Sequence, residues 1–187
     1  MPNQKLIKKL EDWGVDYELL KHKTVYTAHD VAATLKKKLE EIAKTLIVEA
    51  DKTFYFVALP ADKNLDFKKL KKAIEKIGGK VRSVSIPSEK AIVSKLKIKP
   101  GQITGFGSVH NLNRIVDKDL TKVKKVVFSA GQVTESIFMA IKDYLKVEEP
   151  KVEIIGVKKK FKKPKKAKTV KPSKVSKKSK SPKRKKR

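Results

Sequence analysis

The sequence predicts a mixed α/β (α+β) fold, in which one compact domain with a mixed sheet and flanking helices is followed by a basic tail. Apolar residues with helical spacing and with strand spacing interleave along residues 1–157 without a regular strand–helix–strand period. This pattern favours a mixed sheet over a doubly wound one. A chain of this length suffices for one domain that buries about 70% of its unfolded surface. The composition changes sharply near Lys158, so we expect two parts, residues 1–157 and 158–187.

Residues 1–35 predict two helices with a strand between them. Asn3 can cap a helix that has one apolar face and ends at Gly14. Alternating apolar residues over 15–19 predict a strand. Thr27 and Asp30 have the spacing of a capping box, which predicts the second helix.

A hairpin and a third helix are expected next. Residues 44–48 and 53–59 are rich in β-branched and aromatic side chains and predict the two strands of the hairpin. Residues 60–64 predict a loop. Asp66 can then cap a helix that ends at Gly78-Gly79.

Shorter elements are predicted in the centre of the chain. We expect a short strand over residues 80–86 and a small helix that opens at Pro87-Ser88 and runs to about Leu96. Residues 100–107 contain three glycines and predict a loop.

The last third predicts three strands and one helix. Two strands are expected over 114–116 and 123–128, with a turn at Ala130-Gly131, and a closing strand is expected over 152–157. Glu135 and Ser136 are expected at the start of the helix, where capping explains them. Its apolar stripe would be Ile137, Ala140, Ile141, Tyr144 and Leu145.

The basic tail indicates a class of partner. Residues 158–187 hold 18 of the 48 Lys and Arg residues and no Asp or Glu. Such a segment cannot bury enough apolar surface to offset its ordering entropy, so we expect it to be disordered. A dense polycation binds polyanions by releasing their condensed counterions, and nucleic acid is the commonest polyanion. The tail predicts nucleic-acid binding but no reaction.

Composition excludes several classes of protein. The chain has no cysteine, which excludes disulfides and thiol nucleophiles. No apolar run approaches the ~20 residues of a membrane span, and residues 1–10 lack a signal-peptide core. We therefore expect a cytoplasmic protein with no membrane partner. The three histidines are scattered, so no metal site is expected, and no sequence signature of a P-loop or serine hydrolase is present.

Two features are open to a functional interpretation. Lys44 begins an otherwise apolar strand, where it is either an edge residue in water or a cation directed into a pocket. Gly101, Gly105 and Gly107 either form a simple loop or expose backbone N–H groups to an anion. The residues alone leave both alternatives open.

Several stretches, however, resemble the YbaK/EbsC family, which includes the editing domain of bacterial prolyl-tRNA synthetase. The similarity spans about residues 3–157. It rests on His22 followed by residues 24–31, and on residues 43–48, 59–70, 100–107 and 128–131.

This resemblance implies a YbaK-like fold with a curved, mostly antiparallel mixed sheet. It implies hydrolysis of the ester in a mischarged tRNA, with a small amino acid on a proline tRNA as the expected substrate. No metal or cofactor is implied. The expected partners are the mischarged tRNA and a prolyl-tRNA synthetase, and the expected state is a monomer.

The resemblance also implies roles for particular residues. Lys44 matches the lysine most closely tied to activity, where it would hold the terminal phosphate or orient the ester. The other expected substrate-binding residues match the pocket walls, the glycine-rich floor and the adjoining strand end: His22, Thr45, Gly101, Ile103, Gly105, Phe106, Gly107, Ser129 and Gly131. Backbone N–H groups near Gly101 and Gly105 would stabilise an oxyanion.

Two positions depart from the family pattern. Gly105 stands where the family usually has proline, which would loosen the loop, remove a rigid wall and alter amino-acid specificity. Ser136 stands at a commonly acidic position, and no role is assigned to it.

Three alternatives to the deacylase hypothesis remain. The first is a non-catalytic tRNA- or nucleic-acid-binding protein on the same fold. The second is a packaging or ribosome-associated protein in which the tail does the main work. In the third, the terminal residues 181–187 are a nuclear address.

Overall fold

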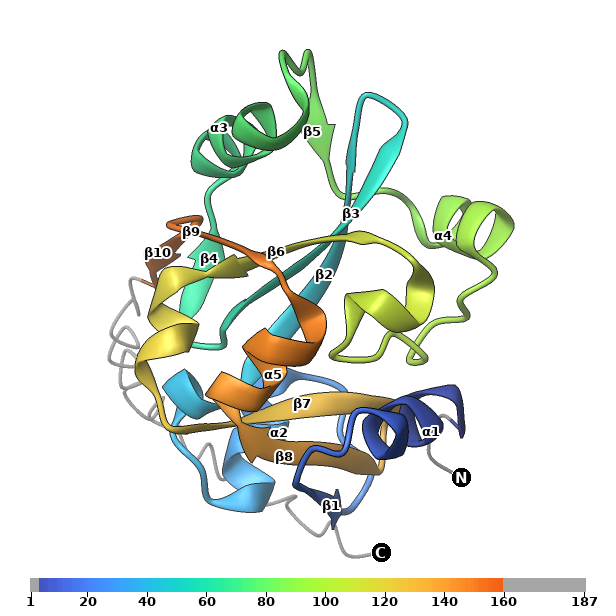
Figure 1. Cartoon of the computed structure of the whole chain (residues 1–187), viewed down its shortest axis with the longest axis vertical. Coiled ribbons are helices and arrows are strands. Elements are labelled where there is room, and N and C mark those ends of the chain that lie inside the picture. Colours follow the sequence, from blue (N-terminus) through green and yellow to red (C-terminus); the bar gives the residue numbers. More distant parts are fainter. Residues whose placement is uncertain (1–3, 160–187) are drawn as a thin grey trace, which may run out of the picture.

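The computed structural model describes residues 4–159 and confirms a mixed α/β fold (Figure 1). The helices are α1 Gln4–Asp12, α2 Ala28–Leu35, α3 Phe67–Gly78, α4 Glu89–Leu96 and α5 Ile141–Glu148, with short 3₁₀ helices η1 Leu39–Glu41, η2 Gly107–His110 and η3 Lys118–Lys122. The strands are β1 Tyr17–Lys21, β2 Ala43–Ala50, β3 Thr53–Pro60, β4 Lys63–Leu65, β5 Val84–Ser85, β6 Asn113–Asp117, β7 Lys125–Gln132, β8 Glu135–Ala140, β9 Lys151–Glu153 and β10 Gly156–Lys158.

The strands form three sheets, which are mostly antiparallel. The main sheet has the order β5-β2-β3-β6-β9, the second has the order β1-β8-β7, and β4 pairs with β10. Parallel pairing within the described sheets is limited to β3–β6 and β6–β9. A parallel bridge between Ile42 and Val127 joins the start of β2 to β7. The main and second sheets therefore meet where β2 begins.

Local sequence signals confirm several predicted elements. The Thr27 side chain accepts a hydrogen bond from the Asp30 N–H at 3.1 Å, and Asp30 returns the contact, which completes the capping box of α2. Asp66 caps α3 and Ser88 caps α4. The β2–β3 hairpin turns at residues 51–52, both of which have positive φ, as a two-residue hairpin turn requires. The predicted Asn3 cap lies outside the described residues, as do residues 160–187 of the tail.

Two predictions in the last third are wrong. Ala130 and Gly131 do not form a turn, because β7 continues to Gln132 through a bulge at which Gly131 has φ +79°. Residues 135–140 are strand β8 and not the start of a helix, and α5 begins at Ile141. A short apolar run fits either structure, and pairing of β8 with both β1 and β7 decides for the strand.

Smaller differences concern the ends of elements. The predicted loop at 60–64 ends in β4, and the strand predicted over 80–86 is reduced to β5. The predicted closing strand is divided into β9 and β10, which belong to different sheets. Residues 100–106 form a loop as predicted, but Gly107 begins η2.

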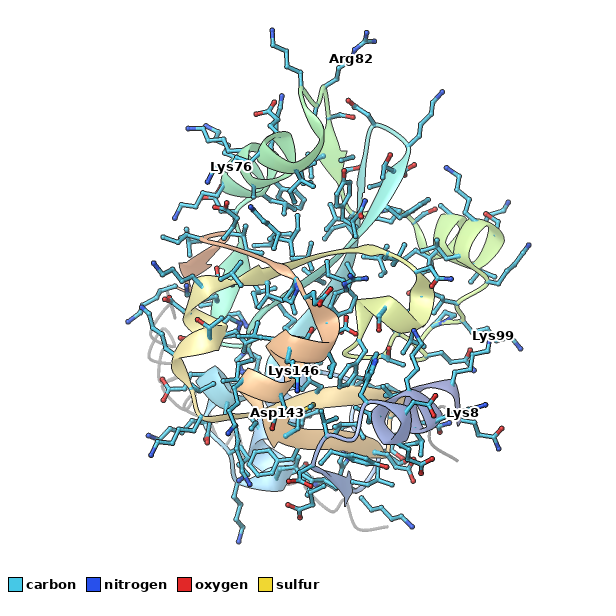
Figure 2. All side chains as sticks on the ribbon, viewed as in Figure 1. Lys8, Lys76, Arg82, Lys99, Asp143 and Lys146 are labelled. Carbon is cyan, nitrogen blue, oxygen red and sulfur yellow. The ribbon has the colours of Figure 1, made fainter. Side chains whose placement is uncertain are left out.

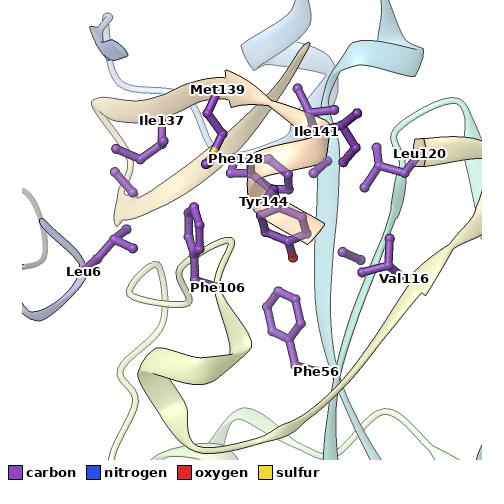
Figure 3. Close-up of a cluster of buried hydrophobic side chains, with 14 of the residues drawn as sticks. Leu6, Phe56, Phe106, Val116, Leu120, Phe128, Ile137, Met139, Ile141 and Tyr144 are labelled. Atoms are coloured by element: carbon purple, nitrogen blue, oxygen red, sulfur yellow. The ribbon is translucent and has the colours of Figure 1, made fainter. Parts of the chain in front are cut away.

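The largest core lies between the main sheet and the second sheet (Figure 3). The Tyr144 ring stacks on Phe128 with a centroid separation of 4.1 Å and meets the edge of Phe106 at 5.3 Å. The Tyr144 hydroxyl donates to the Gly105 carbonyl oxygen at 3.0 Å, so this buried group is satisfied. A second cluster on the other side of the main sheet packs Leu70 and Ile74 of α3 against β2 and β3.

Charged side chains cover the outside of the molecule. Figure 2 shows Arg82 and Lys99 extending away from the ribbon, whereas Lys76 pairs with Glu153 at 2.8 Å. Between residues 4 and 159, we find no helix with the length and apolar character needed to cross a membrane.

Gly105 provides a test of how tightly the core holds the glycine-rich loop. A Cβ atom at Gly105 would overlap the Phe128 side chain. We expect Gly105→Ala to lower the free energy of unfolding by about 1–3 kcal/mol, because overpacking forces the core to shift. Urea denaturation measures this change. Gly78→Ala is the control, because its Cβ would meet only the Tyr55 hydroxyl, at 3.9 Å, and its stability should stay within about 1 kcal/mol of the native value or rise. Equal stability of the two variants would contradict the packing argument.

Candidate active site

The candidate site is a pocket where the main and second sheets meet. Its volume is about 250 Å³. The start of β2 forms one wall, β7 and β8 form another, and the segment from His22 into α2 forms a third. The glycine-rich loop contributes Gly101 and Ile103. The lining combines apolar and polar side chains: His22, Val25, Tyr26, Thr27, Ala28, Val31, Ile42, Ala43, Lys44, Thr45, Gly101, Ile103, Val127, Phe128, Ser129, Gln132, Val133 and Ser136.

The structure brings most of the predicted site residues together in this pocket. Six of them line it: His22, Lys44, Thr45, Gly101, Ile103 and Ser129. The other four, Gly105, Phe106, Gly107 and Gly131, are buried and do not line it.

Gly105 and its neighbours attach the glycine-rich loop to the core. The Gly105 N–H donates to the Ser129 carbonyl oxygen at 2.7 Å, and Thr104 bridges Ala130 of β7. Phe106 is fully buried. A Cβ atom at Gly107 would lie 2.6 Å from Arg114 Cγ, so this position also excludes side chains. Through these contacts with the core, residues 104–107 keep Gly101 and Ile103 of the same loop at the pocket.

The expectation that Gly105 loosens the loop is wrong. Both backbone groups of this residue are hydrogen-bonded, and the space beside its Cα is filled by Phe128. A proline here would lose the bond to Ser129 and overlap Phe128. Gly105 is thus required by packing. Since its N–H is already bonded to Ser129, that group is not directed to an oxyanion.

Lys44 enters the pocket as a half-buried cation on β2. Its Nζ donates to the Lys63 carbonyl oxygen at 2.9 Å. An ammonium group has three N–H bonds, so two more can reach a ligand. Burial, and in second place the charge of Lys159, lower the pKa of Lys44 below its usual value.

A buried ion pair fixes the position of Lys63, whose carbonyl oxygen accepts the hydrogen bond from Lys44. The Lys63 Nζ lies 2.9 Å from Asp117 Oδ1 and also pairs with Asp119. Asp117 is fully buried and accepts three backbone N–H groups as well, from Asp119 at 2.9 Å, Ile155 at 3.0 Å and Gly156 at 2.6 Å. A charge satisfied in this way holds β4 in one position relative to β6 and β10, and Lys44 is anchored to β4.

His22 and Ser136 form a hydrogen-bonded pair in the pocket. His22 Nε2 lies 3.0 Å from Ser136 Oγ, and His22 Nδ1 lies 2.9 Å from the Lys23 carbonyl oxygen. Sequence reasoning placed Ser136 at a helix start and so missed it as a pocket residue. Strand alternation over residues 135–140 was the signal that could have placed it on the face of His22.

Tyr26 is a second pocket residue that sequence reasoning missed. It lies between β1 and α2 and lines the pocket, although 83% of its surface is exposed. At the same rim, Lys159 Nζ lies 2.6 Å from His29 Nε2. The last described residue therefore lies beside α2, whose residues Ala28 and Val31 line the pocket.

No cluster of three or more His, Cys, Asp or Glu side chains suited to a metal ion occurs in residues 4–159. His110 instead lies 3.2 Å from the Thr104 hydroxyl. Burial, with the charges of Lys5 and Lys9, lowers the pKa of His110.

Comparison with known proteins identifies the family. The model of the aminoacyl-tRNA editing domain matches residues 22–147. The chain belongs to the aminoacyl-tRNA editing domain family. Every residue that lines the pocket lies inside the matched segment.

Individual relatives agree with this assignment. The chain is 25% identical over 150 residues to the prolyl-tRNA editing protein ProX of Acetoanaerobium sticklandii, a match that covers 77% of this chain and 88% of that protein. The solved structure of the hypothetical protein APE2540 superposes with a TM-score of 0.71 at 22% identity, covering 82% of this chain and all of that one. A structure described as a candidate trans-editing enzyme for prolyl-tRNA synthetase gives a TM-score of 0.67 at 19% identity, covering 82% and 96%. These two structures share the fold.

The electrostatic environment of Lys44 gives a testable prediction. Burial and the neighbouring cation both disfavour its charged form, so Lys44 should lose its proton at a lower pH than an ordinary lysine, whose pKa is about 10.4. Side-chain NMR, assigned through Lys44→Arg, measures the titration midpoint. Lys159→Ala should raise the midpoint, because it removes the repulsion. Lys72→Ala, at an exposed position of α3, should leave the midpoint unchanged. A midpoint that does not rise in Lys159→Ala would refute this cause.

Proposed function

We propose that this protein is an aminoacyl-tRNA deacylase that hydrolyses the ester of a mischarged tRNA, with a small amino acid on a proline tRNA as substrate. The observation that carries the proposal is the pocket itself. A half-buried cation, a hydrogen-bonded histidine and a small cavity occur together inside the segment that matches the editing domain. The relative named as a prolyl-tRNA editing protein supports the choice of tRNA.

The pocket suits a small amino acid because its volume is about 250 Å³ and several walls are apolar. Val25, Val31, Ile42 and Val127 would contact the side chain of the amino acid. One methylene in such a pocket is worth about 1–3 kcal/mol of discrimination. Discrimination between amino acids would therefore depend on how each side chain fits these walls.

Lys44 would stabilise the charge that develops during hydrolysis. An aminoacyl ester is already activated, so the protein must position water and stabilise an oxyanion. One N–H bond of Lys44 donates to the Lys63 carbonyl oxygen. The two remaining N–H bonds can donate to the ester carbonyl oxygen. Partial burial strengthens this interaction, because the local dielectric constant is lower than in water.

Tyr26 would bind the terminal base of the tRNA. The acceptor end is single-stranded, and unstacked bases commonly stack on aromatic side chains. The exposed ring of Tyr26 at the pocket rim offers such a surface. This contact would bring the ester of the terminal nucleotide next to Lys44.

The basic residues at the end of the chain would bind the tRNA backbone. Residues 158–187 contain 18 cations, and Lys159 lies at the pocket rim beside His29. We propose that this segment is an RNA-binding extension of the editing domain. It would raise the rate of encounter and the retention of tRNA and leave the chemical step to the pocket.

Deacylation of mischarged tRNA tests the proposed reaction. Purified protein should release Ala, Cys, Ser or Thr from proline tRNA faster than buffer alone. Lys44→Ala should lower kcat/KM by about 10²–10³-fold, the cost typical of losing an oxyanion-stabilising donor. Lys90→Ala on exposed α4 is the control and should keep full activity. If no mischarged tRNA is hydrolysed above the buffer rate at any protein concentration, the protein is a non-catalytic binding module.

Truncation after Lys159, which keeps β10 and the contact between Lys159 and His29, tests the role of the tail. The shortened protein should bind tRNA more weakly, and the slope of log affinity against log salt should become smaller, because fewer counterions are released. Filter binding at several salt concentrations measures both quantities. At saturating tRNA its kcat should match that of the full chain. An affinity that is unchanged at low salt would show that the tail is not the RNA-binding element.

A further inference from the structure

We propose that Ser136 and His22 form a proton relay that activates the water attacking the ester. This inference rests on the proposed deacylase function and names a catalytic residue, Ser136, that no sequence signal assigned. Its basis is the hydrogen-bonded chain from Ser136 Oγ through the His22 ring to the Lys23 carbonyl oxygen.

The hydrogen bonds define the direction of this chain. The Lys23 carbonyl oxygen can only accept, so His22 Nδ1, 2.9 Å away, must carry the hydrogen. In the neutral ring Nε2 then has a lone pair and no hydrogen. The Ser136 hydroxyl, 3.0 Å away, must therefore donate to Nε2. This tautomer follows from the network of partners and not from observed hydrogens.

Backbone pairing holds both residues in place. The His22 N–H donates to the Thr134 carbonyl oxygen at 2.9 Å, and the Val25 N–H donates to the Val133 carbonyl oxygen at 2.9 Å. Ser136 lies in the middle strand of the second sheet, opposite Leu20 of β1 and Ser129 of β7. It lines the pocket with only 3% of its surface exposed. The pair is preorganised, as a catalytic group requires.

Two other pocket hydroxyl groups have structural partners. Thr27 Oγ1 bonds to Asp30 in the capping box of α2, at 2.7 Å. Ser129 Oγ accepts the Gly131 N–H at 3.1 Å and supports the bulge of β7. Ser136 differs because its partner is an imidazole nitrogen, which can accept a proton. A hydroxyl coupled to such a base is the arrangement that moves protons in hydrolases.

The Ser136 hydroxyl is hydrogen-bonded to the lone pair of His22 Nε2, so a proton that moves from water to His22 passes through Ser136. A water molecule in the pocket gives a proton to Ser136 Oγ as the serine proton passes to His22 Nε2. The water oxygen forms a bond to the ester carbonyl carbon, and the resulting oxyanion is met by Lys44. When the bond from this carbon to the ribose oxygen breaks, the proton returns through Ser136 to that oxygen. The products are the free amino acid and a tRNA with its hydroxyl restored.

Kinetics of two single variants and their combination test the relay. Ser136→Ala removes the hydroxyl, and His22→Asn keeps a donor for Lys23 but removes the base. Each should lower kcat by about 10²–10⁴-fold with KM changed less than about threefold, because the tRNA contacts remain. The double variant should be no slower than the slower single one, since both act in one step. Ser94→Ala on α4, whose hydroxyl bonds to the Ala91 carbonyl oxygen, is the control with full activity expected.

Two results would overturn the relay while the deacylase proposal stands. One is native kcat in Ser136→Ala, and the other is a double variant whose loss is the product of the single losses. A wild-type protein that hydrolyses no mischarged tRNA overturns the deacylase proposal itself. ¹⁵N NMR of the His22 ring in the native protein adds a test that needs no variant. It should show hydrogen on Nδ1 and a lone pair on Nε2, and the opposite tautomer would exclude the relay.

Discussion

The candidate site depends on one buried carboxylate. Asp117 has no exposed surface, and it holds the Lys63 ammonium and three backbone N–H groups. Removing one partner of such a buried pair typically costs about 3–5 kcal/mol, because a charge is left without compensation. Lys63 in turn presents the carbonyl oxygen that holds Lys44. The N–H groups of Ile155 and Gly156 direct the chain into β10, whose continuation reaches Lys159 at the pocket rim. One interaction therefore places both the candidate catalytic cation and the start of the basic tail.

The pocket residues around Asp117 and Lys63 differ in how far they are buried and in the role proposed for each. Lys44 is half-buried, so its charge acts in a medium less polar than water. On the other side, Ser136 is fixed by strand pairing and His22 by its backbone hydrogen bond to Thr134. Tyr26, the proposed stacking surface for a base, is exposed. The glycines at 105 and 107 are needed because Phe128, Phe56 and Arg114 fill the space where a side chain would lie. Binding surface and chemical groups thus come from separate elements that meet where the two sheets join.

Much of the fold could be predicted because its signals are local. The Thr27, Asp66 and Ser88 caps and the β2–β3 hairpin depend on residues a few positions apart. Strand β8 was mistaken for a helix because its apolar residues suit both periods, and its partners β1 and β7 include one more than 100 residues away. That error also concealed Ser136. Lys44 could be proposed from a family motif, but its anchor could not, because Asp117 and Lys63 are 54 residues apart and form no motif. Long-range pairs of this kind leave no local pattern in one sequence.

The central claim is that the pocket between β2, α2 and β7 holds the aminoacyl end of a tRNA with its ester carbonyl at Lys44. A crystal structure with alanyl-adenosine in which a stable amide replaces the ester tests this most directly. We predict the alanyl methyl group against Val31 and Ile42, the carbonyl oxygen within hydrogen-bond distance of Lys44 Nζ, and the adenine stacked on Tyr26. An analogue bound elsewhere, for instance in the separate cavity lined by Tyr17, Phe138 and Lys142, would contradict the account. So would a carbonyl oxygen turned away from Lys44.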